Sequence, residues 1–186
     1  MPHPHHATWW IGVLFAIGSV CFFVAPFPGF LNLVGAEADA AVFFVGSLFF
    51  TTAAFMQFRS VDRAAHRIDW WSTAIQLVGT VYFNINTYRA LLDAVDSDAV
   101  NRVIWRPELL GSVCFLVSGI LAYKEVRDRM SAVNLAGCVL FMISTLGGYV
   151  VPDTGDALNL AVANAGTSLG ALCFLYGAVV TCRRSS

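Results

Sequence analysis

Apolar residues dominate this sequence in six long runs, and short polar segments separate the runs. A helix needs about 20 apolar residues to cross the hydrocarbon core of a bilayer. The runs are Trp9–Ala25, Ala40–Phe58, Trp70–Leu91, Leu109–Tyr123, Ala132–Val151 and Leu158–Cys182. The pattern predicts an all-α polytopic protein, with six transmembrane helices packed as a bundle in a single membrane domain over residues 1–186.

The polar segments between the runs hold nearly all of the charge. Every acidic residue and every basic residue except Arg89 lies outside the six runs, which avoids the high cost of a charge at the bilayer centre. Charged residues make up 12% of the chain, against about 25% in soluble domains. With a net charge of −1, the sequence also gives no indication of nucleic-acid binding.

The basic residues are distributed unevenly between the two ends of the predicted bundle. The second loop, the fourth loop and the C-terminal tail hold eight of the eleven Lys and Arg residues. The positive-inside rule therefore predicts an inner-membrane protein with both termini in the cytoplasm. No Lys or Arg precedes the first run, so we expect that run to be a retained helix and not a cleavable signal peptide.

A five-residue motif recurs once in each run, with Gly first and Phe last. The copies are GSVCF, GSLFF, GTVYF, GSVCF, GCVLF and GALCF. Their glycines are Gly18, Gly46, Gly79, Gly111, Gly137 and Gly170, and Gly166 adds a GxxxG pattern to the last run. Small residues let helices approach closely in lipid, so we interpret the motif as a helix-packing motif. The motif indicates either six single-helix units or three helical hairpins. Because adjacent spans alternate in direction, we favour the hairpin as the repeating unit, with three copies over about 9–58, 70–123 and 132–182.

The N-terminal part of the chain also suggests a family. The segments WWIGVLFAIGSVCFF and FFVGSLFFTTAAFMQF resemble the YrhK-like family of small bacterial integral membrane proteins, and IQLVGTVYFNINT and RPELLGSVCFLVSG resemble it in part. The resemblance implies a membrane protein built from two-helix modules and implies no catalytic residue.

The third run carries an unusual number of polar side chains on one helical face. They are Thr73, Gln76, Thr80, Asn84 and Thr87. Polar groups in lipid must find partners, so we expect this face to point into the bundle. Two interpretations stay open: a polar lining for a small neutral solute or ion, or hydrogen bonds between helices.

Other candidate chemistry is sparse. His66 lies close in sequence to Asp62 and Asp69, and a tail holds His3, His5 and His6, but both patterns are typical of solvated segments. The five cysteines form no CxxC pair, and we expect them to be reduced packing residues. We therefore predict no enzyme activity, no cofactor and no metal.

Two functions fit this pattern. The first is an accessory helix bundle that packs in the lipid bilayer with a second copy or with another membrane protein. The second is a passive channel or facilitator that is lined by the polar face of the third run.

Overall fold

The computed structural model describes residues 4–92 and 97–185 and is all-helical over them. The long helices are α1 (Pro4–Val24), α3 (Ala36–Ser60), α4 (Arg67–Leu91), α6 (Arg106–Val126), α7 (Arg129–Gly147) and α8 (Leu160–Ser185). The short ones are α2 (Pro28–Val34), α5 (Ser97–Val100) and the π-helix η1 (Asn101–Trp105). Five helices are long and apolar enough to cross a membrane, namely His6–Val24, Ala36–Ser60, Asn101–Val126, Arg129–Gly147 and Leu160–Ser185.

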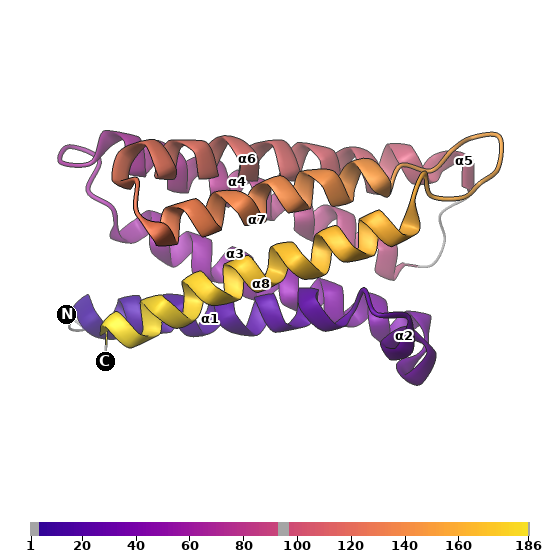
Figure 1. Cartoon of the computed structure of the whole chain (residues 1–186), viewed down its shortest axis with the longest axis horizontal. Helices are drawn as coiled ribbons and strands as arrows, with labels where there is room; N and C mark the ends of the chain where they lie inside the picture. The colour runs from indigo at the N-terminus through magenta and orange to yellow at the C-terminus, as the bar shows by residue number, and fades with distance from the viewer. Residues whose placement is uncertain (1–3, 93–96, 186) are drawn as a thin grey trace.

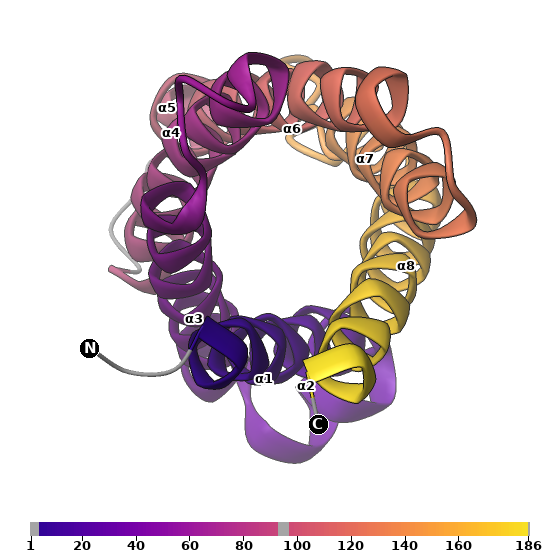
Figure 2. The ribbon, with the colours of Figure 1, turned by 90° about the vertical axis from the view of Figure 1, so that its left-hand side faces the viewer.

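The six long helices form a closed ring (Figures 1 and 2). Each contacts two neighbours in the order α1, α3, α4, α6, α7 and α8, and α8 returns to α1. Both ends of the described chain lie at the same end of the ring. A hydrogen bond of 3.2 Å from the Ser168 hydroxyl to the carbonyl of Phe23 joins α8 to α1 at the closure.

The five-residue motif has the same orientation in all six ring helices. Its first, second and fifth residues are buried, its third is exposed and its fourth is half-buried in every copy. The exposed third residues are all Val or Leu, such as Val20 and Val81. An apolar side chain facing outward is what a lipid-facing surface requires, so the motif distinguishes the inner and outer faces of each helix.

The motif glycines pair within three hairpins, which are α1 with α3, α4 with α6, and α7 with α8. A Cβ built on Gly79 would lie 3.1 Å from the carbonyl oxygen of Gly111, and the reverse distance is also 3.1 Å. The same Cβ would lie 2.8 Å from the ring of Phe115, while one on Gly111 would lie 3.2 Å from the ring of Phe83. The phenyl ring of each helix therefore packs over the glycine of its partner helix.

Several helix boundaries differ from those predicted from hydropathy. Helix α7 ends at Gly147, before the predicted Val151, because the following segment turns back and pairs Val150 with Ala157. Asn101 accepts a hydrogen bond of 3.0 Å from the Val150 backbone N–H and donates one to its carbonyl. The segment between the first two predicted runs contains a further short helix, α2, which starts at Pro28. Proline fits the first turn of a helix because it has no backbone N–H that would need a partner.

Candidate functional site

The centre of the ring is filled by one Phe from each ring helix. These six residues, the phenylalanine plug, are Phe22, Phe50, Phe83, Phe115, Phe141 and Phe174. They are the last residues of the six motifs, and each is no more than 8% exposed. The plug therefore occupies the place where a pore through the ring would run.

The plug has two layers because neighbouring helices are antiparallel. In one layer the ring of Phe141 lies 6.0 Å from Phe22 and 5.9 Å from Phe83, centroid to centroid. In the other layer Phe174 lies 6.0 Å from Phe50 and 5.9 Å from Phe115. These separations are typical of packed aromatic pairs, so the rings are in mutual contact.

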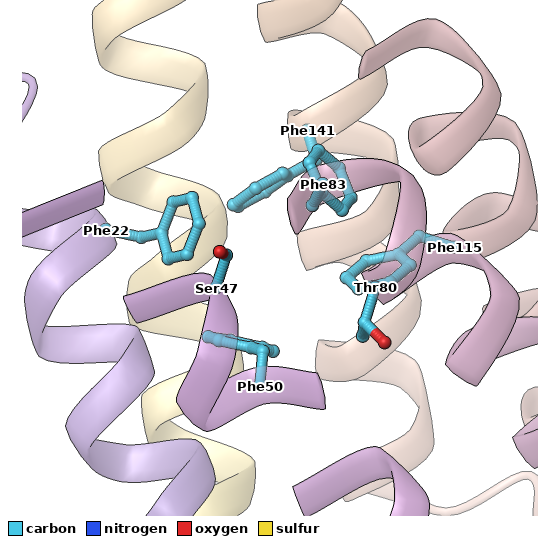
Figure 3. A pocket seen from close by; sticks show the side chains of 7 residues that line it. All are labelled: Phe22, Ser47, Phe50, Thr80, Phe83, Phe115 and Phe141. Carbon is cyan, nitrogen blue, oxygen red and sulfur yellow. The ribbon is translucent and has the colours of Figure 1, made fainter. Parts of the chain in front are cut away.

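Little space remains inside the plug. The void between the rings, which Ser47 and Thr80 also line, has a volume of about 10 Å³ (Figure 3). A single water needs roughly 10–15 Å³ of such space and two to four polar partners. The void is therefore at the lower limit for one water and is much too small for a solute.

A much larger cavity, the vestibule, lies on one side of the plug. Its volume is about 320 Å³, and Phe22, Phe83 and Phe141 form its floor. All six ring helices contribute to its walls. It lies where α3 and α6 begin and where α4 and α7 end, which is the end of the ring that carries the first, third and fifth loops.

The vestibule walls carry two carboxylates and no cation among the lining residues. Asp39 comes from the first turn of α3 and Glu108 from the first turn of α6. The polar lining is completed by Asn86, Thr87, Ser144, Asn164 and Thr167. Both carboxylate side chains are half-buried. The vestibule is therefore an apolar-floored chamber with acidic and amide walls.

Glu108 is held by neighbours from two other helices. The hydroxyl of Thr145 donates to its carboxylate at 3.3 Å, and Asn86 is a second hydrogen-bonding neighbour. Thr145 is itself 2.7 Å from the Ser112 hydroxyl. Asp39 differs, because its Oδ1 is buried and has no hydrogen-bond partner among the described residues. One carboxylate is thus positioned by the protein, and the other keeps an acceptor free.

The polar residues predicted on α4 do not share one environment. Thr73 donates to the backbone of its own helix, at 3.0 Å to Asp69, and Thr80 lines the small void. Thr87 lines the vestibule and lies 2.9 Å from the Ser47 hydroxyl, hydroxyl to hydroxyl. Asn84 accepts a hydrogen bond of 3.1 Å from Thr51. Gln76 is half-buried and lines neither cavity.

Hydropathy reasoning missed the two vestibule acids because it placed them in loops. Asp39 and Glu108 each stand one residue before a predicted apolar run. The helices begin earlier, at Ala36 and Arg106, so both acids lie inside helices. The available signal was an acidic residue at the start of a helix, where it complements the helix dipole.

Comparison of the chain with protein-family models, with curated proteins and with solved structures finds no match. The resemblance to the YrhK-like family therefore stays a prediction.

Proposed function

We propose that the chain is a six-span inner-membrane protein with cytoplasmic termini, and that α4 is the sixth span. Helix α4 has 25 residues and lies in the ring between α3 and α6. Its polar residues lower its mean hydropathy, but its outward positions are apolar, with Val78, Val81 and Ile85 exposed by 42–50%. In the proposed orientation the vestibule faces away from the cytoplasm. We also propose that the three hairpins are copies of one two-helix unit, on the basis of their shared motif.

We propose that the vestibule binds a small organic ammonium ion. The observation that carries this proposal is the presence of Asp39 and Glu108 in a chamber with no cationic lining residue. Carboxylates that face a chamber without a cation attract a positive ligand. The volume of about 320 Å³ falls within the range of about 300–1,000 Å³ found for small-molecule sites.

The aromatic lining favours an organic cation over a hydrated metal ion. Four phenyl rings line the vestibule, from Phe22, Phe43, Phe83 and Phe141. The face of an aromatic ring attracts an alkylated ammonium group, and such groups are bound in aromatic cages. A hydrated divalent ion would instead favour walls made mostly of oxygen ligands. An ammonium ion can contact the phenyl floor and the acidic walls at the same time.

Of the two functions that the sequence leaves open, this geometry favours the one that handles a solute. It favours a one-sided binding chamber over a passive channel, because the polar residues of α4 do not form a continuous lining and the plug fills the axis. A chamber closed by a hydrophobic constriction is the arrangement found in gated pathways. An accessory bundle would need no acidic chamber in its interior.

Binding of choline to the purified full-length protein tests the proposal. We expect choline to bind and its neutral isostere 3,3-dimethylbutan-1-ol to bind at least tenfold more weakly. Asp39→Asn and Glu108→Gln should each weaken choline binding about tenfold, which is about 1.4 kcal/mol. Glu37→Gln is the matched control, because Glu37 is exposed in the same first turn of α3 and does not line the vestibule.

Three results would contradict the ammonium site. One is equal binding of choline and its neutral isostere, which would show that charge is not recognised. Another is choline binding that neither Asp39→Asn nor Glu108→Gln changes. The third is absence of choline binding, which would favour the accessory-bundle function.

The topology is tested separately by cysteine labelling in a variant without the five native cysteines. Ala64→Cys lies in the α3–α4 loop and Thr154→Cys in the α7–α8 loop, and both positions are exposed. With α4 as a span, a membrane-impermeant maleimide should label position 154 from outside the cell and position 64 only after permeabilisation. Labelling of both positions from the same side would refute the six-span arrangement.

A further inference from the structure

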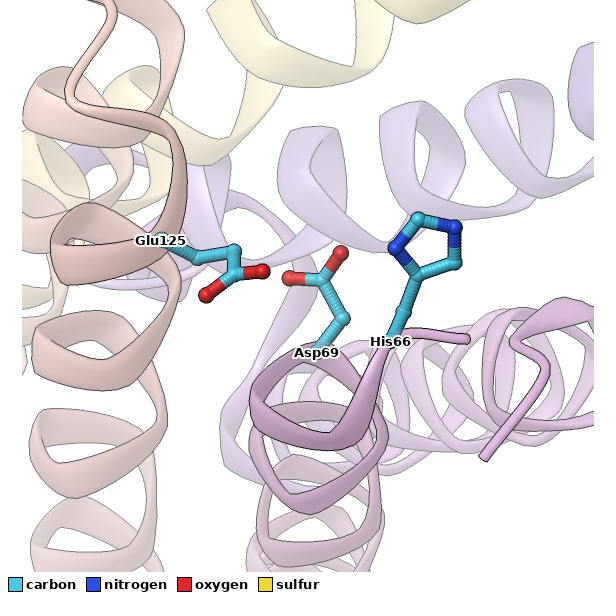
Figure 4. Close-up of side chains that lie close together, drawn as sticks. All are labelled: His66, Asp69 and Glu125. Carbon is cyan, nitrogen blue, oxygen red and sulfur yellow. The ribbon is translucent and has the colours of Figure 1, made fainter. Parts of the chain in front are cut away.

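Three potential metal ligands converge at the end of the ring opposite the vestibule (Figure 4). His66 is the N-cap of α4, Asp69 lies in the first turn of α4, and Glu125 lies in the last turn of α6. One ligand atom from each side chain lies within 4.8 Å of those of the other two. The three side chains point toward one another from two segments that are far apart in the sequence.

The carboxylates of Asp69 and Glu125 face each other, and no partner among the described residues offsets their negative charges. Among the described residues, no ion pair or hydrogen bond engages the side-chain oxygens of Asp69 or Glu125. The nearby guanidinium of Arg63 is stacked instead over the ring of Trp70, at 4.7 Å from its centroid. Two carboxylates at this separation repel each other unless a cation lies between them. The arrangement is therefore an anionic side-chain cluster at the surface, with an imidazole at its edge.

The backbone holds this cluster in place. The N–H of His66 donates to the carbonyl of Asp62 at 2.9 Å, and the carbonyl of His66 accepts from the N–H of Trp70 at 2.9 Å. Asp69 is part of the regular α4 helix, and Glu125 is part of α6, which packs along α4. Only the side-chain torsions remain to be adjusted when a ligand binds, which lowers the cost of ordering the site.

We propose that His66, Asp69 and Glu125 bind one first-row divalent metal ion and thereby join the start of α4 to the end of α6. Imidazole nitrogen suits Zn²⁺ and its neighbours in the series, and carboxylate oxygen is also a zinc ligand. Metal–ligand bonds of about 2.0–2.2 Å in a tetrahedral site place the ligand atoms roughly 3.4 Å apart. Since the ligand atoms lie within 4.8 Å of one another, the side chains must close by at most about 1.4 Å, which small rotations provide.

This site is independent of the vestibule. The vestibule-lining residues of these two helices lie away from the cluster, in the C-terminal part of α4 and the first turn of α6, and they are Phe83, Asn86, Thr87, Ala90 and Glu108. Metal binding would fix the rim of the α4–α6 hairpin in the region that we propose to be cytoplasmic. Because His66 and Glu125 are exposed, water can complete the coordination shell.

The test uses the full-length chain in which His3, His5 and His6 are replaced by Ala, since a histidine tail binds metals by itself. We expect equilibrium dialysis with Zn²⁺ to give one ion per chain, and Zn²⁺ to raise the thermal unfolding temperature. His66→Ala, Asp69→Asn and Glu125→Gln should each weaken Zn²⁺ binding at least tenfold and remove the thermal shift. Co²⁺ should give visible d–d absorption that His66→Ala abolishes.

Asp62→Asn is the matched control, because Asp62 is an exposed acid of the same loop and lies outside the cluster. Its amide oxygen can still accept the hydrogen bond from the N–H of Ala64. This variant should bind Zn²⁺ like its parent. In the absence of metal, each variant should unfold at a temperature no lower than that of the parent, which excludes misfolding as the cause of lost binding. The proposal is overturned if the tail-free protein binds no Zn²⁺, or if none of the three substitutions changes the affinity.

Discussion

Gly166 lies where the backbone of α8 packs closely against that of α7, and replacing it with Ala should separate the two helices. A Cβ at Gly166 would lie 2.8 Å from the carbonyl oxygen of Leu140, 2.8 Å from the Cβ of Ser144 and 3.0 Å from its Cα. All three atoms belong to the backbone of α7 or are attached directly to it. No side-chain rotation relieves the overlap, so α7 itself must move.

The magnitude follows from the size of that movement. Ordinary van der Waals contact begins at 3.4 Å, so α7 must shift by about 0.6 Å. A gap of that size forfeits roughly a quarter to a half of the dispersion energy along the interface. It also stretches the hydrogen bonds of the Ser144 hydroxyl to Ala163, at 2.6 Å, and to Thr167, at 2.7 Å. We expect Gly166→Ala to lower the free energy of unfolding by about 2 kcal/mol, within the range for overpacked cores.

Gly177→Ala provides a matched control in the same helix. A Cβ at Gly177 would meet no atom within 4 Å. Its effect is limited to helix propensity, which is about 1 kcal/mol or less for Gly to Ala, so this variant should unfold within about 1 kcal/mol of the parent. The assay is reversible unfolding by SDS in mixed micelles, followed by circular dichroism. Equal stability of the two variants would refute the close-packing argument.

Three further predictions concern other contacts. Phe141→Ala should lower the free energy of unfolding by about 3–5 kcal/mol, because Phe141 contacts four other rings of the plug. Phe55→Ala should lower it much less, because Phe55 is 53% exposed on the outside of α3. Equal SDS unfolding midpoints for the two variants would contradict this prediction. Ser112→Ala removes the hydroxyl contact to Thr145 and should lower the free energy of unfolding by about 0.6–1.7 kcal/mol. A double-mutant cycle with Thr145→Val should show energetic coupling between the two positions. The Ser131 N–H donates to Asp128 at 2.7 Å, and together with the Ser131 hydroxyl it holds the pKa of the Asp128 carboxyl below its usual value of 3.8. Because this pKa is depressed in the folded state, the ionised Asp128 carboxylate stabilises the folded protein above pH 3.8. This contribution is lost as the pH falls through the folded-state pKa. The thermal unfolding temperatures of the parent and Asp128→Ala should therefore converge in acid.

The sequence by itself predicted the six long helices and the inner face of each one. Apolar runs of the right length predict membrane helices, since hydropathy is a local property of the chain. The recurrence of Gly, a small residue and Phe identified the packing face, because side chains at i and i+4 lie on one side of a helix. Thus the glycine positions could be predicted as helix contacts, and α4 could be recognised as the most polar of the six runs.

Helix ends and functional residues were less accessible from sequence. Asp39 and Glu108 border apolar runs, so hydropathy assigns them to loops, although α3 and α6 extend over both of them. The end of α7 depends on a turn that Asn101 fixes from 49 residues away. Likewise, nothing local to His66 shows that Glu125, near the end of a different helix, lies beside it.

Only the tertiary structure decided that the helices close into a ring. Closure brings α8 against α1 and gathers the six phenyl rings of the plug around the axis of the helix ring. The phenyl rings fill the centre and leave the vestibule on one side of the plug. The physical reason is that the pattern of small and apolar residues along a helix predicts which face is buried, but not which other helix packs against that face. Partner choice depends on the fit of distant surfaces, such as Gly79 against Gly111. The vestibule and the metal-ligand cluster are products of that fit, because each combines residues from helices that the sequence alone does not place together.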